Sequence, residues 1–238
     1  MTERQPFLRS SSRVRLRRAA TILVAAGLLA GCRPPAPRLK PPPIVVSLEG
    51  YGSLRLEAEG GRVKSRFSFL VRLPALGRVE VFDLLGRVMF YFVLAGPEAR
   101  LVVPSEKVYW PASSSEVMDK FLGFALSLEE WASLICGVWP ASLSAGPELS
   151  GWTLRRDARN RVISGEKGTL AFEIKEFFAG SPSPRRVAFS GQTSRGSLTV
   201  FDLRFNTTAR DELFSLGPPQ DFQPKTWDEI VRLLQREN

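Results

Sequence analysis

The chain has 238 residues, which suits a single domain with one core, and it contains no histidine and only two cysteines, Cys32 and Cys136. The missing histidine excludes Ser-His-Asp and Cys-His catalysis and removes the most common zinc ligand of proteins. The formal charge is +9, but six arginines against one glutamate lie in residues 1–18, so only +4 remains from Cys32 onward. That remainder is spread among many carboxylates, and the sequence therefore predicts no nucleic-acid binding.

The first residues have the pattern of an export signal. A basic segment, residues 1–18, precedes the apolar run 19–30, which is too short to cross a bilayer as a permanent helix. Leu29-Ala30-Gly31-Cys32 resembles the lipobox of bacterial lipoproteins. This implies a signal peptide over residues 1–31, cleavage before Cys32 and attachment of lipid to the Cys32 thiol. The alternative is an ordinary signal peptide with a cysteine placed there by chance.

A proline-rich tether is predicted over residues 32–43, where the prolines favour an extended polyproline conformation that cannot join a sheet. Arg33 follows the cysteine at a position where an aspartate resembles the signal that keeps enteric lipoproteins in the inner membrane. We therefore expect the protein at the cell outer membrane, anchored by its N-terminal lipid and facing the periplasm.

The remaining residues, 44–238, begin as antiparallel strands. From Ser47 to Ala58, apolar or glycine residues alternate with polar ones. Glu59-Gly60-Gly61-Arg62 then supplies a hairpin turn into a second strand from Val63 to Leu73. Turn signals separate further predicted strands at residues 78–83, 88–94, 99–103 and 107–110.

The pattern then changes to a helical period. Ser113 with Glu116, and Ser127 with Glu130, predict capping boxes that open helices over residues 113–124 and 127–136. The apolar residues of both helices recur at helical spacing and are expected to lie against the sheet. Cys136, at the end of the second helix, is expected as a small buried core residue.

Strands resume after these helices, with predicted turns at Glu166–Gly168 and Thr193–Gly196, and a last helix follows Thr226. The additional strands are predicted at residues 151–156, 160–164, 169–176, 185–190 and 197–205. The fold class is therefore mainly β, of the α+β type. We expect a curved antiparallel half-barrel of about eleven strands with three helices packed on its concave side.

Three segments together resemble the LolB-like family of outer-membrane lipoprotein receptors. They are Val79–Gly86, Glu116–Gly123, and Leu128–Gly137 followed by Pro140. The resemblance implies a half-open barrel whose helices close around an apolar cavity for acyl chains. It also implies a function: the protein would receive acylated lipoproteins from a LolA-like periplasmic carrier and insert them into the outer membrane. Such transfer needs no catalytic group and no cofactor, so we do not expect an enzyme. We also expect the protein to be a monomer.

The resemblance also implies two sets of site residues. The membrane-insertion loop would be Leu84, Leu85 and Gly86, with Leu85 as the exposed leucine and Leu84 at a position where the family commonly has proline. Ordinary burial of both leucines at a strand end is the alternative. The acyl-chain cavity would be lined by Leu54, Leu56, Phe67, Phe69, Val71, Phe90, Phe92, Phe121, Phe124, Trp131 and Leu134. Simple core packing is the alternative for each of these.

Two other functions are compatible with the sequence. A lipid-anchored envelope structural or assembly factor would have a closed interior and no lipid-transfer activity. A hydrolase would use neighbouring carboxylates, such as Glu129 with Glu130 or Asp211 with Glu212, but adjacent residues on a helix point in different directions. The acidic residues are scattered and histidine is missing, so no metal site is predicted.

Overall fold

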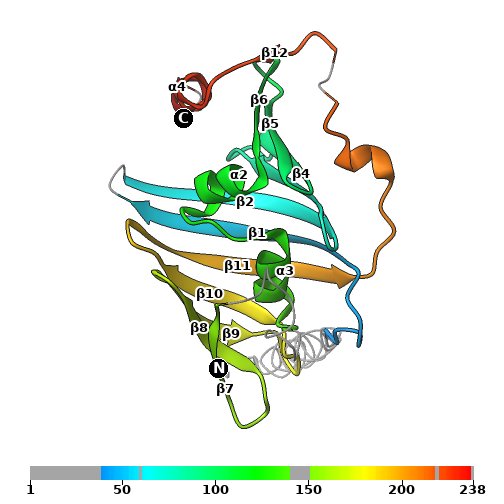
Figure 1. Ribbon diagram of the computed structural model, residues 1–238, viewed down its shortest axis with the longest axis vertical. Helices are drawn as coiled ribbons and strands as arrows, with labels where there is room; N and C mark the ends of the chain where they lie inside the picture. Colours follow the sequence, from blue (N-terminus) through cyan, green and yellow to red (C-terminus); the bar gives the residue numbers. More distant parts are fainter. Residues whose placement is uncertain (1–38, 59–60, 140–150, 218–219, 237–238) are drawn as a thin grey trace, which may run out of the picture. The chain divides into compact units, whose positions relative to one another are not determined.

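One curved sheet organises the domain (Figure 1). The computed structural model describes residues 39–58, 61–139, 151–217 and 220–236, and within them twelve strands form this sheet. The strands are β1 (Ser47–Ala58), β2 (Gly61–Arg72), β3 (Leu76–Phe82), β4 (Val88–Ala95), β5 (Glu98–Val103), β6 (Val108–Ser113), β7 (Thr153–Arg156), β8 (Val162–Lys167), β9 (Leu170–Phe177), β10 (Pro184–Ser190), β11 (Ser194–Phe205) and β12 (Gln223–Pro224).

The strand order is β12-β6-β5-β4-β3-β2-β1-β11-β10-β9-β8-β7, so β1 to β6 form one meander and β7 to β11 another. The two meanders join through the antiparallel pairing of β1 with β11, and only β12 runs parallel to its neighbour, β6. Strands β12 and β7 are the two edges, so the sheet is open. This confirms the predicted fold class. The twelfth strand has two residues, too few to produce an alternating pattern in the sequence.

Phenylalanines lie across glycines on the inner face of the sheet. Four register pairs place a Phe ring over a glycine of the neighbouring strand. A Cβ on Gly50 would come within 2.5 Å of the Phe69 ring, and one on Gly165 would meet Phe172 at the same distance. A side chain at these glycines would therefore displace the ring, and the glycines let the rings cover the strand backbone. The four pairs are Gly50–Phe69, Gly52–Phe67, Gly165–Phe172 and Gly196–Phe189.

Two helices, α2 (Ser114–Leu122) and α3 (Leu128–Cys136), cover that inner face (Figure 1). Both begin with the predicted capping boxes, at Ser113 and Ser127. The first helix ends at Leu122 rather than Phe124, because Gly123 adopts a left-handed conformation, φ 82°, and caps it.

The third helix, α4 (Trp227–Arg236), packs against β6, next to the edge strand β12. The ring of Trp227 lies 4.9 Å from that of Trp110, and Ile230 is fully buried. A short 3-10 turn, η1 (Asp211–Phe214), crosses the outer face instead, where Phe214 is buried beneath the Arg72 guanidinium.

The turn predicted at Thr193–Gly196 is wrong. Ser194 already begins β11, and its carbonyl accepts the N–H of Gly191 at 2.7 Å, which closes the turn two residues earlier. The Ser194 hydroxyl also donates to the Gly123 carbonyl at 2.9 Å. Tertiary contacts with α2 and β10 therefore draw these residues into the strand.

Candidate functional site

The turn between β3 and β4 is held by one carboxylate. Asp83 Oδ1 accepts the backbone N–H groups of Leu85 and Arg87 at 2.8 and 2.9 Å, and Oδ2 accepts Arg87 Nε at 2.7 Å. Gly86 supplies the positive φ of 81° that closes the turn. Every side-chain bond of the turn thus comes from Asp83 and Arg87, and none from Leu84 or Leu85.

Both leucines at the tip are exposed. Leu84 has a relative exposure of 102% and Leu85 of 79%, the two highest values among the exposed large hydrophobic residues of the described chain. The side chains are not buried at a strand end, which was the alternative. Their role in membrane insertion remains a prediction.

The turn between β7 and β8 has the same construction with a polar tip. Asp157 accepts the N–H groups of Arg159 and Arg161 at 2.9 and 3.0 Å and the Arg161 side chain at 2.8 Å, and Asn160 takes the positive φ. Ala158 and Arg159 stand where the other turn has its leucines. Because this turn forms without leucine, Leu84 and Leu85 are not required to build theirs.

We expect Asp83→Ala to loosen the β3–β4 turn. The pKa of Asp83 is lowered, first by the hydrogen bond from the Arg87 backbone and then by the Arg87 side chain. A carboxyl whose pKa falls on folding stabilises the turn above its ordinary pKa and stops doing so as the pH falls through the folded value. Amide hydrogen exchange at Leu85 and Arg87 should therefore be faster in Asp83→Ala at neutral pH.

Asp157→Ala is the matched control for this variant, because it removes the same bonds from the β7–β8 turn. It should speed exchange at Arg161 and leave Leu85 unchanged. Equal exchange at Leu85 in the wild type and in Asp83→Ala would show that the carboxylate does not hold the turn.

The candidate cavity residues lie together between the sheet and the helices, in close contact with one another. Phe121 of α2 packs edge-on against Phe67 and Phe92, with ring centroids 5.7 and 5.1 Å apart, and Trp131 of α3 packs against Phe69 at 5.4 Å. Eight of the eleven are buried: Leu54, Phe67, Phe69, Val71, Phe92, Phe121, Trp131 and Leu134. The other three are partly buried against this core: Leu56, Phe90 and Phe124. Their role in binding acyl chains remains a prediction.

The indole nitrogen of Trp131 is a buried polar atom in this otherwise apolar interior. Its side chain is 1% exposed, yet its indole N–H finds no acceptor among the described residues. Leaving a buried donor unpaired costs about 1–3 kcal/mol. A ligand carbonyl in this interior would provide the missing acceptor.

Glu130 fixes α3 to the other end of the sheet. The carboxylate is 2% exposed and accepts the indole N–H of Trp152 at 2.7 Å, the ammonium of Lys167 and the backbone N–H of Ser127 at 2.9 Å. This residue was expected only as a helix cap or as one of two neighbouring acids. Its contacts with Trp152, directly before β7, and with Lys167 of β8 instead make it the polar attachment of α3 to this end of the sheet.

Neither proposed pair of carboxylates is free to act as an acid–base pair. Both Glu130 oxygens are engaged in the contacts of α3, and Asp211 pairs with Arg72 at 2.7 Å. The described residues include no group of three or more acidic or cysteine side chains placed to hold a metal ion.

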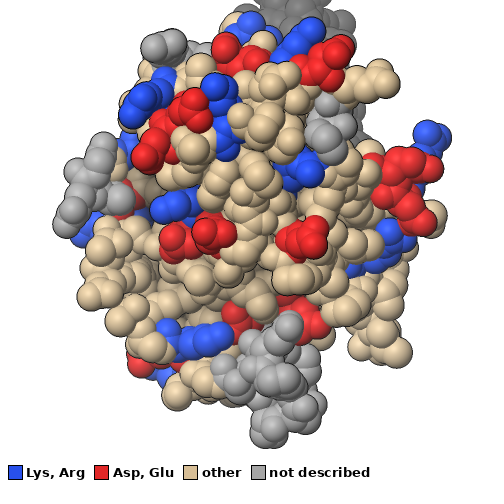
Figure 2. Space-filling view, turned by 45° about the horizontal axis from the view of Figure 1, so that its top comes forward, with Lys and Arg blue, Asp and Glu red and all other residues tan. Residues whose placement is uncertain are grey.

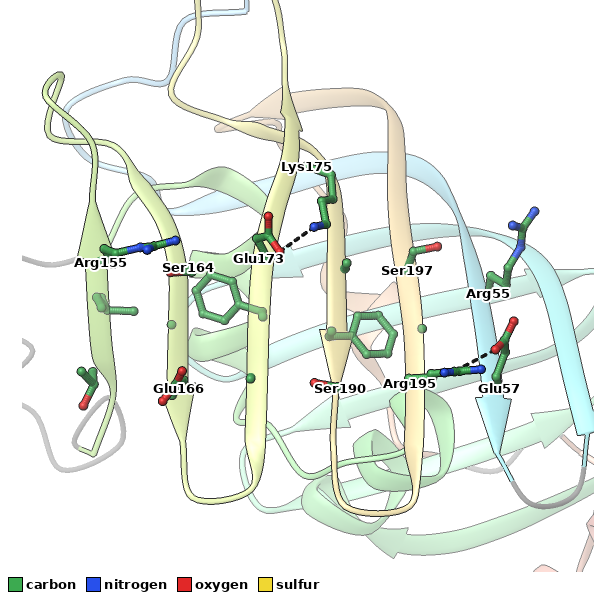
Figure 3. Close-up of a pocket in the computed structure, with 18 residues that line it drawn as sticks. Arg55, Glu57, Arg155, Ser164, Glu166, Glu173, Lys175, Ser190, Arg195 and Ser197 are labelled. Carbon is green, nitrogen blue, oxygen red and sulfur yellow. Dashed lines mark hydrogen bonds and ion pairs between the residues drawn. The ribbon is translucent and has the colours of Figure 1, made fainter.

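A shallow groove of about 850 Å³ runs across the outer face of β1 and β7 to β11 (Figure 3). Its floor consists of small side chains, among them Ser164, Ala188 and Ser197. Two ion pairs line it: Glu173–Lys175 lies within β9, and Glu57–Arg195 joins β1 to β11. Figure 3 shows both, with Arg55 and Arg155 at opposite ends. The groove has no signature in the sequence, because only strand pairing brings the side chains that line it together.

The face seen in Figure 2 has acidic and basic side chains interspersed, with broad uncharged areas between them. No helix in the described part of the chain is long and apolar enough to span a bilayer. The predicted signal peptide, Cys32 and most of the predicted tether lie outside the described residues. Cys136 is buried, as expected, and burial raises the pKa of its thiol to about 11.

Comparisons with known proteins support the fold and do not show the family or the function. No protein-family model matches the chain, and no curated protein does. Among solved structures, a DUF1329 family protein from Desulfovibrio piger superposes with a TM-score of 0.50 and 7% identity, over 73% of this chain and 91% of that one. At this identity the likeness supports a shared fold alone.

Two further solved structures superpose less well. A LolA superfamily protein from Nitrosomonas europaea gives a TM-score of 0.48 at 13% identity, covering 71% of this chain and 90% of that one. A putative outer membrane lipoprotein-sorting protein domain from Vibrio parahaemolyticus gives 0.47 at 11% identity, covering 71% and 88%. None of these descriptions names the LolB-like family, so that resemblance remains a prediction.

Proposed function

We propose that this protein is a lipid-anchored outer-membrane lipoprotein of the LolB-like type. In this proposal Cys32 carries the lipid, the interior between sheet and helices receives the acyl chains of lipoproteins from a LolA-like carrier, and Leu84 with Leu85 enters the bilayer to release them. The observation that carries the proposal is the pair of exposed leucines on a turn that does not need them.

An apolar side chain in water is unfavourable, and burying a leucine contributes about 1.5–3 kcal/mol. Two adjacent exposed leucines on a constrained turn therefore favour an apolar partner. The hydrocarbon region of a bilayer is such a partner. Leu84 and Leu85 inserted there, which we call the leucine wedge, would lower the free-energy cost of moving an acyl chain between the protein and the membrane.

The interior favours a ligand with a carbonyl group beside its apolar chain. The walls are aromatic and aliphatic, and the indole N–H of Trp131 is a donor without an acceptor among the described residues. Acyl chains attached through esters or amides combine these two features. Because Phe121 and Trp131 contact the sheet directly, acyl chains would enter only when α2 and α3 move away from it.

The second candidate is a lipid-anchored envelope assembly factor without lipid-transfer activity. The close ring contacts between the helices and the sheet favour it, because a filled interior leaves no room for cargo. The two candidates differ in one property, the uptake of acyl chains by the folded protein.

We expect Leu84→Glu/Leu85→Glu to block release while leaving uptake intact. The purified lipidated protein would be loaded with a fluorescent fatty acid and mixed with vesicles that contain a lipid-borne quencher. Loading should match the wild type, and the transfer rate should fall at least tenfold, because charged side chains do not enter hydrocarbon.

The control is Ala158→Glu/Arg159→Glu, which puts the same charges on the matching turn and should transfer at the wild-type rate. Wild-type transfer by the leucine variant would contradict the insertion role. Absence of loading in every protein would contradict acyl-chain binding and leave the assembly factor.

A further inference from the structure

Three neighbouring cations on the outer face have no acidic partner. Arg55 of β1 and Lys64 of β2 face each other in the strand register, and Arg66 lies two residues further along β2. All three side chains are exposed, and none forms an ion pair within the described residues. We call these three residues the cationic patch.

Two carboxylates adjoin the patch along the strands, and both are bound by other cations. Glu57 is bound by two arginines, Arg62 at 2.7 Å and Arg195 at 2.9 Å. Asp83 is bound by Arg87 at 2.7 Å. The positive charge of the patch is therefore not compensated locally, and its attraction for an anion is undiminished.

Apolar and aromatic side chains continue the patch on the same face. Arg66 faces Phe82 in the register of β2 and β3, and Phe82 directly precedes the turn that bears the leucines. The Tyr51 ring lies 6.3 Å from Phe82 and 5.7 Å from Phe201, which is 48% exposed at a bulge in β11. Cations, aromatic rings and two leucines thus adjoin one another along one side of the sheet.

The opposite end of this face is covered. Phe214 of η1 packs beneath Arg72, and Arg72 pairs with Asp211. This segment contacts β3 and β4 and leaves the end with the cationic patch open within the described residues. The outer face of the β1–β3 strands is therefore bare where its cations are unpaired within the described residues, and covered where Arg72 is paired.

We propose that this face docks on a bilayer of anionic phospholipid, with the cationic patch on the lipid phosphates. Tyr51 lies at the level of the headgroups, where an amphipathic ring is favoured, and the apolar rings of Phe82 and Phe201 with the leucines of the turn face the acyl chains. The inference rests on the proposed function for the leucines and adds the class of lipid and the face that meets it.

The test places a fluorescent probe on the docking face of the full lipidated chain. Ser53→Cys introduces a thiol between Arg55 and Tyr51, and labelling is selective because Cys136 is buried. The labelled protein is anchored in vesicles of phosphatidylcholine alone, or of an equal mixture with phosphatidylglycerol, each with a headgroup-borne quencher. We expect stronger quenching in the anionic vesicles and its loss as salt is raised.

The variant Arg55→Gln/Lys64→Gln/Arg66→Gln should lower the ratio of docked to undocked protein by about a hundredfold, since each cation near an anionic surface contributes roughly a fivefold factor. The control is Lys107→Gln/Arg159→Gln/Arg232→Gln, which removes three exposed cations with no ion pair within the described residues from elsewhere. It should leave the quenching unchanged.

A second probe, at Leu85→Cys, separates this inference from the proposed function. Quenching of that probe without quenching at Ser53 would overturn the docking face and retain the leucine wedge. Quenching at neither site would overturn both. Equal quenching at Ser53 in the two kinds of vesicle, or in the Gln variant of the cationic patch and the wild type, would also overturn the docking face.

Discussion

Trp131→Ala should lower the free energy of unfolding by about 3–5 kcal/mol, the usual cost of removing a large buried aromatic side chain. The ring is 1% exposed and packs edge-on against Phe69, so its loss leaves a cavity between α3 and the sheet. Denaturant unfolding followed by circular dichroism measures the change. A loss below about 1 kcal/mol would show that α3 is not packed against the sheet in solution.

Trp131→Phe separates packing from the indole N–H. Phenylalanine keeps most of the ring volume and removes the buried donor that has no acceptor among the described residues. The relief of that unpaired donor offsets part of the lost contact, so we expect a stability cost of only about 1 kcal/mol. If the N–H binds the carbonyl of a cargo, the same variant should weaken fatty-acid binding about fivefold to tenfold. Unchanged binding would exclude this role.

Glu130→Ala is the second large effect, with an expected loss of about 3 kcal/mol. The change removes the half of the capping box in which Glu130 accepts the Ser127 amide N–H, worth about 1 kcal/mol. It also leaves the Trp152 indole N–H without its acceptor, which costs about 1–3 kcal/mol more. Lys167 adds little to this sum, because its side chain is 36% exposed and remains hydrated. Thermal or denaturant unfolding measures the loss.

Glu116→Ala is the matched control, because Glu116 makes the same capping box at the start of α2 but is exposed. Its removal should cost about 1 kcal/mol or less. Equal losses for the two variants would mean that Glu130 acts only as a cap and does not attach α3 to β7 and β8.

Local features of the fold were predictable from the sequence, because each depends on residues close together in the chain. Alternation over Ser47–Ala58 predicted β1, and the capping boxes at Ser113 and Ser127 gave the starts of both inner helices. The 3-10 turn η1 and the two-residue strand β12 were not predicted, since neither has a periodic pattern.

The candidate site was predictable only in part. Leu84 and Leu85 were singled out through a resemblance, but two leucines after a strand are equally compatible with burial, and only the structure shows them exposed. The aromatic residues of the interior were predicted to lie together. Whether these residues enclose a space depends on how closely the helices approach the sheet. The spacing of apolar residues in the sequence does not determine that distance.

By itself, the sequence determined the mainly β fold class, the two capped helices, the exclusion of histidine chemistry and the prediction of an anchor at Cys32. The tertiary structure decided three further features: the contact of Trp131 with Phe69, the burial of Glu130 beside Trp152 and Lys167, and the cationic patch beside the exposed leucines. The physical reason is the separation along the chain of the residues that interact. Periodicity and capping act over a few residues, whereas these three features depend on strand register and packing between residues far apart in the chain.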